Sequence, residues 1–339
     1  MTPVRIALAG IGGWGRNLAR HFGTLHDVQL RYLCDRSQHR LDEFVGRFAD
    51  TQLTTDYAGV LADPAVDAIV LATSAPVHFP LGLAALQAGK DLYVEKPMTL
   101  RVDEAQALID AARARDRILM VGHLLVYHPA VRALRELAGA GELGRIHQLH
   151  AQRLNLGTVR PDENVAWDLA LHDLAAILFV LGDEPVEVSA RGYAVVPGGI
   201  EEVAFLTIAF AGGAVAHLHA SWLDPVKTRR LTVIGDRAMA VFDDLADPAD
   251  RLRVFDKGFA VTSGPGGAAV IATRDGGAAR SLPLASADTL RLECSHFADC
   301  VRTRRMPLSD GREGLRVIRV LAAADASMKA GGAPVSLRE

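Results

Sequence analysis

Cysteine is scarce in this chain of 339 residues. There are three cysteines, Cys34, Cys294 and Cys300, and no two of them have Cys-x-x-Cys spacing. Such an odd and sparse set argues against a disulfide framework and against a thiolate zinc site. We interpret Cys294 and Cys300 as buried residues of a helix and not as reactive thiols.

A strong net charge is also lacking, because 37 Lys and Arg residues face 40 Asp and Glu residues. Binding to nucleic acid or to an anionic membrane usually needs a basic face, so we expect neither partner. The apolar runs are too short to cross a bilayer, and the N-terminus does not read as a signal peptide. We therefore expect a cytoplasmic protein.

Hydrophobic residues are plentiful, at 50% of the chain, and their pattern changes part-way along it. Up to about Gly122, short apolar runs alternate with helical patterns, which is typical of a doubly wound parallel sheet. We expect this dinucleotide-binding Rossmann domain at 1–122. Its expected strands are residues 5–10, 29–34, 68–72, 91–94 and 118–121.

The rest of the chain has longer strand patterns and fewer helices, which favours a large, mostly antiparallel, open-faced sheet in an α+β domain. We expect this second domain, for substrate binding and oligomerisation, at 123–339, and its C-terminal helices could pack back on the first domain. The stretch 263–279 is rich in Gly and Ala and reads as a loop or loose hairpin. The expected strands are 146–154, 185–196, 203–210, 214–222, 230–234 and 238–242, and the expected helices are 130–138, 168–181, 288–304 and 311–330.

The first strand ends in a G-x-G-x-x-G motif, Gly10 to Gly15, with a helical pattern behind it. The three glycines allow a tight turn, close approach of a pyrophosphate, and close packing of helix on strand. Asp35 ends the second strand, where its carboxylate can bond ribose hydroxyls. The acid favours NAD over NADP, although Arg36 partly offsets that preference. The alternative is a structural strand–helix turn.

Two further strand ends carry polar residues at the edge where ligands of such sheets gather. Thr73, Ser74 and His78 follow the third expected strand and could contact the dinucleotide, or form a simple Pro-containing exit. Lys96 follows the fourth strand, in Glu95-Lys96-Pro97. Its ammonium could hydrogen-bond a substrate oxygen and favour alkoxide-like character, or it could be a surface lysine before a turn.

Taken together, the glycine motif, Asp35 and Glu95-Lys96-Pro97 resemble the Gfo/Idh/MocA oxidoreductases over nearly the whole chain. The resemblance implies a substrate-side lysine and usually a cis peptide before Pro97. We assign the following residues to the cofactor: Gly10, Gly12, Gly13, Trp14, Gly15, Asp35, Arg36, Thr73, Ser74, His78, Glu95, Lys96, Pro97 and His123.

The same family carries an acid and a histidine one helical turn apart in the second domain. Asp168 and His172 have this spacing, which places both side chains on one helix face. The resemblance implies that His172 is the general base for a hydroxyl proton, since its ordinary pKa lies near working pH. Asp168 could orient it or bond a sugar hydroxyl. Our catalytic candidates are therefore Lys96, His172 and Asp168.

A longer set of residues resembles a branch that acts on nucleotide sugars, similar to UDP-N-acetylglucosamine 3-dehydrogenases. It comprises the stretch 122–129, Arg153 to Gly157, Arg160, Glu163, Trp167 and His172-Asp173. The arginines could meet a diphosphate, Asn155 an acetamido group, and the aromatic residues a sugar or uracil face. Alternatively, Arg153 and Asn155 bond only the backbone at a sheet edge. The substrate candidates are Lys96, Tyr127, Arg153, Asn155, Arg160, Trp167, Asp168 and His172.

Histidine pairs recur in the expected strands, at His147 with His150 and at His217 with His219. The second pair shares one strand face and could bind a metal, but no carboxylate or cysteine accompanies it in a ligand pattern. We favour polar sheet residues and expect no metal site. The open sheet face needs cover, so we expect a homodimer or homotetramer formed through it.

These expectations favour an NAD-dependent dehydrogenase that oxidises a sugar hydroxyl, in particular the 3-hydroxyl of a UDP-N-acetyl hexosamine. Two alternatives remain open. One is a dehydrogenase of a free polyol such as inositol, for which the second-domain arginines would not matter. The other is a regulatory NAD-binding protein without catalysis, although such a sensor has no need of Lys96 and His172.

Overall fold

The computed structural model describes residues 2–157, 159–160, 163–263 and 269–338. The chain divides into two compact units, and the first combines Met1–Tyr127 with Ala287–Ile318. The second comprises His128–Ser286 and Arg319–Glu339. Residues 123–127 and 287–318, which we placed in the second domain, group with the first unit; the second of these ranges includes C-terminal helical segments that we expected could pack back on the first domain.

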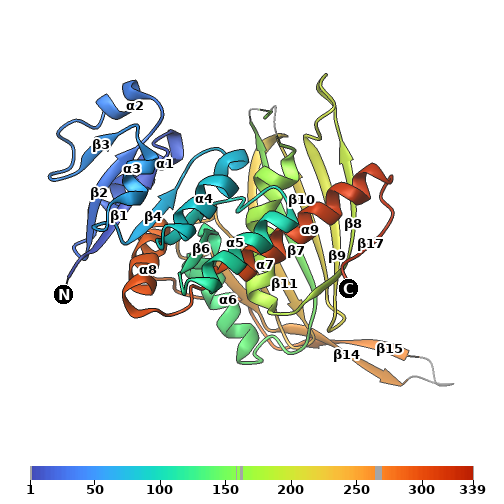
Figure 1. Ribbon diagram of the computed structural model, residues 1–339. Coiled ribbons are helices and arrows are strands. Elements are labelled where there is room, and N and C mark those ends of the chain that lie inside the picture. Colours follow the sequence, from blue (N-terminus) through green and yellow to red (C-terminus); the bar gives the residue numbers. More distant parts are fainter. Residues whose placement is uncertain (1, 158, 161–162, 264–268, 339) are drawn as a thin grey trace. The chain divides into compact units, whose positions relative to one another are not determined.

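The first unit contains a six-stranded, wholly parallel sheet with strand order β3-β2-β1-β4-β5-β6 (Figure 1). This order is that of a Rossmann sheet and confirms the predicted fold class. Prediction missed one strand, β3, which has three residues and no apolar run. The strands are β1 Val4–Ala9, β2 Val28–Cys34, β3 Gln52–Thr54, β4 Ala68–Leu71, β5 Asp91–Glu95 and β6 Leu119–Gly122.

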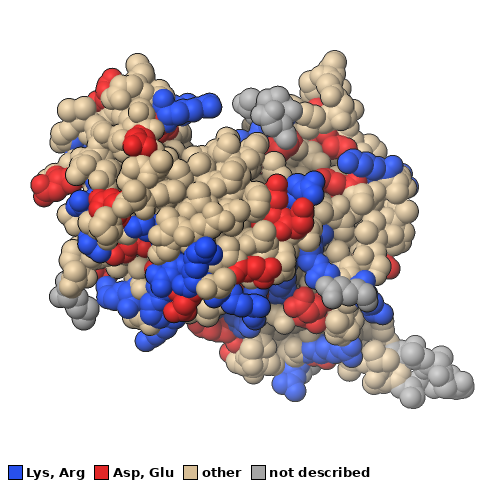
Figure 2. Space-filling view, viewed as in Figure 1, with Lys and Arg blue, Asp and Glu red and all other residues tan. Residues whose placement is uncertain are grey.

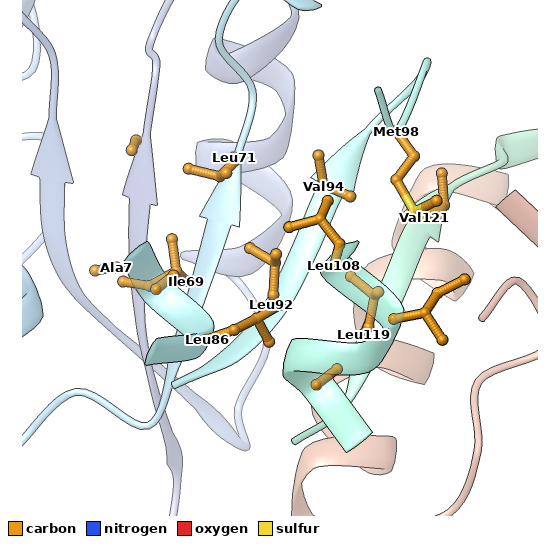
Figure 3. Packing of buried hydrophobic residues seen from close by; sticks show 14 of the residues in the cluster. Ala7, Ile69, Leu71, Leu86, Leu92, Val94, Met98, Leu108, Leu119 and Val121 are labelled. Carbon is orange, nitrogen blue, oxygen red and sulfur yellow. The ribbon is translucent and has the colours of Figure 1, made fainter. Parts of the chain in front are cut away.

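Helices cover both faces of this sheet, because successive side chains of a strand point to opposite sides. Leu92 and Val94 of β5 join the core under α4 and α5 (Figure 3), whereas Tyr93 between them packs on Phe22 of α1 and Phe297 of α8. The helices of this unit are α1 Gly13–Phe22, α2 Gln38–Asp42, α3 Tyr57–Ala62, α4 His78–Gln87, α5 Val102–Ala114 and α8 Thr289–Thr303, with 3₁₀ turns η1 Ala75–Val77 and η2 Leu124–Tyr127.

The second unit contains a nine-stranded sheet with order β16-β13-β12-β11-β7-β10-β9-β8-β17. Its neighbouring strands are antiparallel except β7 and β10, so the sheet is mixed and mostly antiparallel, as predicted. The strands are β7 Ile146–Leu156, β8 Pro185–Tyr193, β9 Val203–Phe210, β10 Val215–Ser221, β11 Leu223–Gly235, β12 Met239–Asp243, β13 Leu252–Phe255, β16 Arg280–Ser281 and β17 Val335–Ser336.

One face of this sheet is buried and the other is more exposed, since Leu149 and Ala151 are buried while Gln148 and Gln152 are exposed. The strands β14 Lys257–Ser263 and β15 Ala269–Asp275 form a separate antiparallel hairpin where a loop or loose hairpin was expected; residues 264–268 of that stretch lie outside the described residues. The unit's helices are α6 Pro129–Gly139, the π-helical turn η3 Ala166–Ala170 and α7 Leu171–Leu181, and α9 Gly311–Lys329 runs from the first unit into the second.

Charge on the visible surface is mixed, with Lys and Arg interspersed among Asp and Glu (Figure 2). This distribution accords with a formal net charge of −3. Among the described residues, none of the helices is long and apolar enough to span a bilayer.

Candidate functional site

A cavity of about 620 Å³ lies in the first unit beside the carboxyl ends of β1, β2 and β4. Ligands of open parallel sheets bind at such ends, next to the point where the strand order reverses. Nine of our cofactor candidates lie within the first 74 residues, and eight of them line this cavity. Its walls include Gly10, Gly12, Gly13, Trp14, Asp35, Arg36, Arg40, Tyr57, Thr73 and Ser74.

The geometry of the turn after β1 requires glycine at two positions. Gly10 has a φ of +92°, and a Cβ there would lie 2.7 Å from the Ala72 carbonyl carbon. A Cβ on Gly15 would overlap the Gly10 carbonyl oxygen. Side chains are therefore excluded where strand and helix approach each other, which is the packing role predicted for the third glycine.

The start of α1 is open to an anion. Gly12 precedes the helix without a side-chain cap, and a Cβ on Gly13 would meet nothing within 4 Å. Helix N-terminal N–H groups and the helix dipole favour a phosphate at such a position. The buried Thr73 hydroxyl has no hydrogen-bond partner among the described residues. These features fit the pyrophosphate and polar groups of a dinucleotide.

Asp35 is buried at the end of β2, and its carboxylate also organises the turn. It accepts hydrogen bonds from the backbone N–H of Ile11 and of Ser37, both at 2.9 Å. A carboxylate has about four acceptor positions, so two remain for ribose hydroxyls. Arg40 Nη1 lies 3.6 Å from Asp35 Oδ2, and Arg36 is exposed at the cavity wall.

The Glu95-Lys96-Pro97 loop is tied to the glycine turn. Glu95 accepts hydrogen bonds from Trp14 Nε1 at 2.7 Å, from Tyr93 Oη at 3.0 Å and from the Lys96 N–H at 3.1 Å. The Lys96–Pro97 peptide is cis. Glu95, which we assigned to the cofactor, thus has its carboxylate bound by donors of the protein. These hydrogen bonds fix both loops.

His78 and His123 are buried close to these loops. The His78 ring nitrogens lie 2.8 Å from the Pro97 carbonyl oxygen and 3.1 Å from that of Thr73, so the ring joins two strand-end loops, and burial lowers its pKa. His123 follows β6, and neither ring nitrogen has a partner among the described residues. Burial, aided by the nearby charge of Lys96, lowers the pKa of His123 to about 4. A neutral imidazole therefore lies near Lys96.

In the second unit, Asp168 is the centre of a buried polar group. It lies in the π-helical turn η3, and π-helical turns occur frequently at functional sites. Trp222 Nε1 donates to Asp168 Oδ2 at 3.1 Å, and Arg160 Nη2 lies 3.1 Å from Asp168 Oδ1. Arg160 also pairs with Glu163 at 3.3 Å and keeps about half of its side chain exposed.

His172 is the second residue of α7 and is partly exposed. Its neighbour Asp173 forms a bidentate pair with Arg153 of β7, at 2.6 and 3.0 Å. The pair connects the first turn of α7 to the sheet. Asp173 also occupies one edge of the Arg153 guanidinium, the group that we expected to bind a diphosphate. Diphosphate binding by Arg153 stays a prediction, and this pairing does not favour it.

Three other substrate candidates differ in exposure. Asn155 is partly exposed near the end of β7, and its amide nitrogen would lie 2.7 Å from a Cβ on Gly157. Trp167 is 6% exposed and donates from Nε1 to Asp325. Tyr127 is 1% exposed, and its hydroxyl lies 2.9 Å from the Ser309 hydroxyl. Because both rings are buried, a stacking role for either of them would require its face to become exposed.

Sequence reasoning missed Arg40 and Trp222 of these groups, and it also missed Glu293, a fully buried acid of the first unit. Arg40 lies five positions after Asp35, so its place near the second strand end was a usable signal. Trp222 directly follows the strand β10, but no sequence pattern predicted its contact with Asp168, which lies 54 residues away in the chain. Glu293 lies inside the helix α8, where an acid usually indicates a solvent-facing side.

Comparison with known proteins agrees with this geometry. Residues 4–123 match the family described as "Oxidoreductase family, NAD-binding Rossmann fold", and residues 131–241 match the GFO/IDH/MocA C-terminal domain. The chain belongs to the Gfo/Idh/MocA oxidoreductase family. Its first unit is accordingly an NAD-binding Rossmann domain, as the glycine turn and Asp35 predicted.

Within the Gfo/Idh/MocA family, the chain is similar to the UDP-N-acetylglucosamine 3-dehydrogenase of Acidithiobacillus ferrooxidans, with 32% identity over 94% of this chain and 95% of that protein. A solved structure of that enzyme covers 97% of this chain and 99% of its own, with a TM-score of 0.83 and 29% identity. The scyllo-inositol 2-dehydrogenase (NAD(+)) of Bacillus subtilis is 24% identical over 98% of this chain and 96% of its own. GenD2 from gentamicin A biosynthesis, solved in complex with NAD, shares the fold with a TM-score of 0.84, at 22% identity over 100% of this chain and 97% of its own.

The described parts of the chain contain no group of three or more His, Cys, Asp or Glu residues that could hold a metal ion. The histidines of the exposed sheet face contact other rings instead: His150 stacks on His217 at 5.6 Å, and His219 stacks on Phe205 at 4.3 Å. These contacts are consistent with polar sheet residues.

Proposed function

We propose that this Gfo/Idh/MocA oxidoreductase oxidises the 3-hydroxyl of a UDP-N-acetyl hexosamine to a ketone, with NAD as hydride acceptor. One observation carries the reaction class: a dinucleotide cavity whose glycine turn is joined, through Trp14 and Glu95, to the loop that bears Lys96. The likeness to a UDP-N-acetylglucosamine 3-dehydrogenase over 94% of the chain supports the substrate.

The proposed chemistry removes two hydrogens from the alcohol: the O–H proton goes to the protein, and the hydride on the carbon goes to the cofactor. Lys96 donates a hydrogen bond to the substrate oxygen, and His172 takes the O–H proton as general base. The hydride would leave the carbon that bears this hydroxyl for the nicotinamide ring of bound NAD, and a C=O bond would remain. This proposal requires the side chain of Lys96, from the first unit, and that of His172, from the second, to reach one hydroxyl.

Asp168 and Arg160 would form the part of the site that selects the substrate. The Asp168 carboxylate, which meets Trp222 and Arg160, would accept a hydrogen bond from a sugar hydroxyl. The half-exposed Arg160 guanidinium suits a diphosphate better than the buried and paired Arg153 does. Asn155 is the candidate donor to the acetamido group.

The test is incubation of purified protein with NAD and separate sugars while the absorbance of NADH is followed. We expect NADH with UDP-N-acetylglucosamine or UDP-N-acetylgalactosamine, and little with UDP-glucose or myo-inositol. A substrate deuterated at C3 should deliver deuterium to NADH, whereas one deuterated at C4 should not. Deuterium delivered from C4, or no turnover of any nucleotide sugar, would contradict the proposal.

A second candidate is oxidation of a free polyol, favoured by the similarity to an inositol dehydrogenase over nearly the whole chain. Turnover of myo-inositol above the nucleotide sugars would select it. Stoichiometric NAD binding without NADH from any sugar would select the regulatory alternative.

We also propose that the exposed sheet face of the second unit forms a homodimer or homotetramer interface. Phe205 and Tyr193 pack edge-to-face on it and remain 46% and 52% exposed. Large exposed apolar groups of this kind favour association. A monomer by light scattering at working concentration would count against this assembly.

A further inference from the structure

Two carboxyl groups are buried together in the first unit, on the side of the sheet covered by α1 and α8. Glu95 is 7% exposed and Glu293 is 0% exposed. The Glu95 charge acts directly on Glu293, and both act on Tyr93. Two carboxylates this deeply buried cannot both stay ionised at small cost, because desolvation and their repulsion add.

The surroundings of the two groups are unequal. Glu95 has three donors: the Trp14 indole, the Tyr93 hydroxyl and the Lys96 backbone N–H. Neither Glu293 oxygen forms a hydrogen bond of normal geometry among the described residues, since the nearby Tyr93 hydroxyl donates its proton to Glu95. Donors stabilise the ionised form, and burial without donors stabilises the neutral form. Burial raises the pKa of Glu95 too, but its three donors and the charge of Lys96 oppose that shift, so Glu95 is the member of the pair that ionises first.

Among the groups that the structure describes, Glu293 is acted on by the charge of Glu95 and not by that of a cation. The nearby groups are Tyr93, Glu95, Cys294 and Tyr127, all neutral or acidic. Burial, together with the Glu95 carboxylate, raises the pKa of Glu293 well above its usual range. A neutral carboxyl carries one O–H donor, which needs an acceptor in this apolar setting.

We propose that Glu293 is a positioning residue: it stays protonated and donates a hydrogen bond to the Tyr93 hydroxyl, which donates in turn to the Glu95 carboxylate, so that the buried pair carries one negative charge and holds the glycine turn and the lysine loop together. Glu95 transmits the effect, because the same carboxylate binds Trp14 at the cavity wall and the Lys96 N–H. The role belongs to a helix nearly 200 residues away from the lysine loop in sequence. It rests on the proposed function only in so far as Lys96 is catalytic.

Infrared spectroscopy of the NAD-free protein tests the protonation directly. At neutral pH the wild type should show the C=O band of a buried carboxylic acid, and Glu293→Gln should lose it. No such band in the wild type, or a band that survives E293Q, would overturn the proposal. The measurement needs no substrate, so it stands whatever sugar the enzyme oxidises.

A matched pair of variants tests the positioning role. E293Q keeps the size and a donor toward Tyr93, whereas E293L keeps much of the volume and has no donor. We expect E293Q to bind NAD within about threefold of wild type. E293L should bind about tenfold more weakly, with a changed pH profile of binding, because the hydrogen-bond chain through Tyr93 to the charged Glu95 loses its first donor. Equal NAD affinity and pH profiles for the two variants would show that Glu293 only fills space and would overturn the proposal. If neither variant folds, the wild-type infrared band still decides.

Discussion

The first unit forms its cavity mainly from backbone, whereas the second forms its candidate substrate group from paired side chains. Gly10 and Gly15 are required because a Cβ would collide with main-chain atoms. Asp168, Trp222 and Arg160 depend instead on contacts between side chains that are far apart in sequence. The steric requirements of a turn depend on residues close together in the sequence. The candidate cofactor residues could therefore be predicted in more detail than the candidate substrate residues.

The comparison is sharpest at the two proposed catalytic groups, one in each unit. Lys96→Met and His172→Gln should each lower kcat by about 10³-fold, since one loses stabilisation of the developing alkoxide and the other the general base. Affinity for NAD should stay within about threefold, because neither change touches the glycine turn. Stopped-flow measurement of NADH formation reports the loss of catalysis, and titration with NAD reports the affinity.

Arg101→Met is the control for Lys96→Met. Arg101 is an exposed cation near the same loop, and it pairs with Asp103. It should leave kcat unchanged. If K96M and R101M behave alike, the lysine is a surface residue and the proposed chemistry fails.

The backbone character of the cofactor end can be tested at Gly15. Gly15→Ala should weaken NAD binding by about 100-fold and destabilise the protein by about 2 kcal/mol, because the new methyl group overlaps the Gly10 carbonyl oxygen. Gly13→Ala is the matched control, since its Cβ meets nothing within 4 Å of the protein. We expect its melting temperature to equal that of wild type. Equal melting temperatures for G15A and wild type would contradict the steric argument.

The fold could be predicted from the sequence because its signals repeat. Five apolar runs identified five of the six parallel strands, and the change of rhythm after Gly122 indicated the antiparallel sheet. Prediction shortened β11 to 230–234, whereas the strand is Leu223–Gly235. A register shift between Leu223 and Thr228 breaks the alternation there, so its first half has no period that a sequence pattern could reveal.

The candidate site could be predicted only in part. The glycine turn, Asp35 and Lys96 lie at strand ends, and their positions follow from the sheet topology. The partners of Arg153 and of Trp167 did not follow, because Asp173 and Asp325 reach them through packing of separate elements. Glu293 was hidden for the same reason: its burial depends on α8 lying beside α1 and β5.

His123, in the first unit, allows a test through the dependence of protein stability on pH. Its pKa falls from 6.5 to about 4 on folding, because burial disfavours the charged ring. The unfolded chain therefore binds the proton first, and stability is lost as pH falls from about 6.5 toward 4. The loss is at most about 3 kcal/mol at one residue.

His123→Phe should flatten the dependence of the free energy of unfolding on pH over this window, in denaturant titrations without NAD. The exposed His39 is the control, and His39→Phe should retain the wild-type slope. An unchanged slope in H123F would mean that the imidazole is hydrated or paired, and not a neutral group held near Lys96.

The smallest expected effect asks whether Arg160 meets the substrate or only supports Asp168. Arg160→Gln should raise the KM for the UDP-sugar about tenfold and leave the KM for a free polyol unchanged, since a polyol has no diphosphate. Because Arg160 also pairs with Asp168, the measurement is repeated in an Asp168→Asn background. If the arginine contacts the diphosphate itself, its effect on KM persists in that background. If its only role is to hold Asp168, the effect on KM disappears in that background, as expected for two coupled residues. Contact of Arg160 with the diphosphate would then not explain selection of a nucleotide sugar.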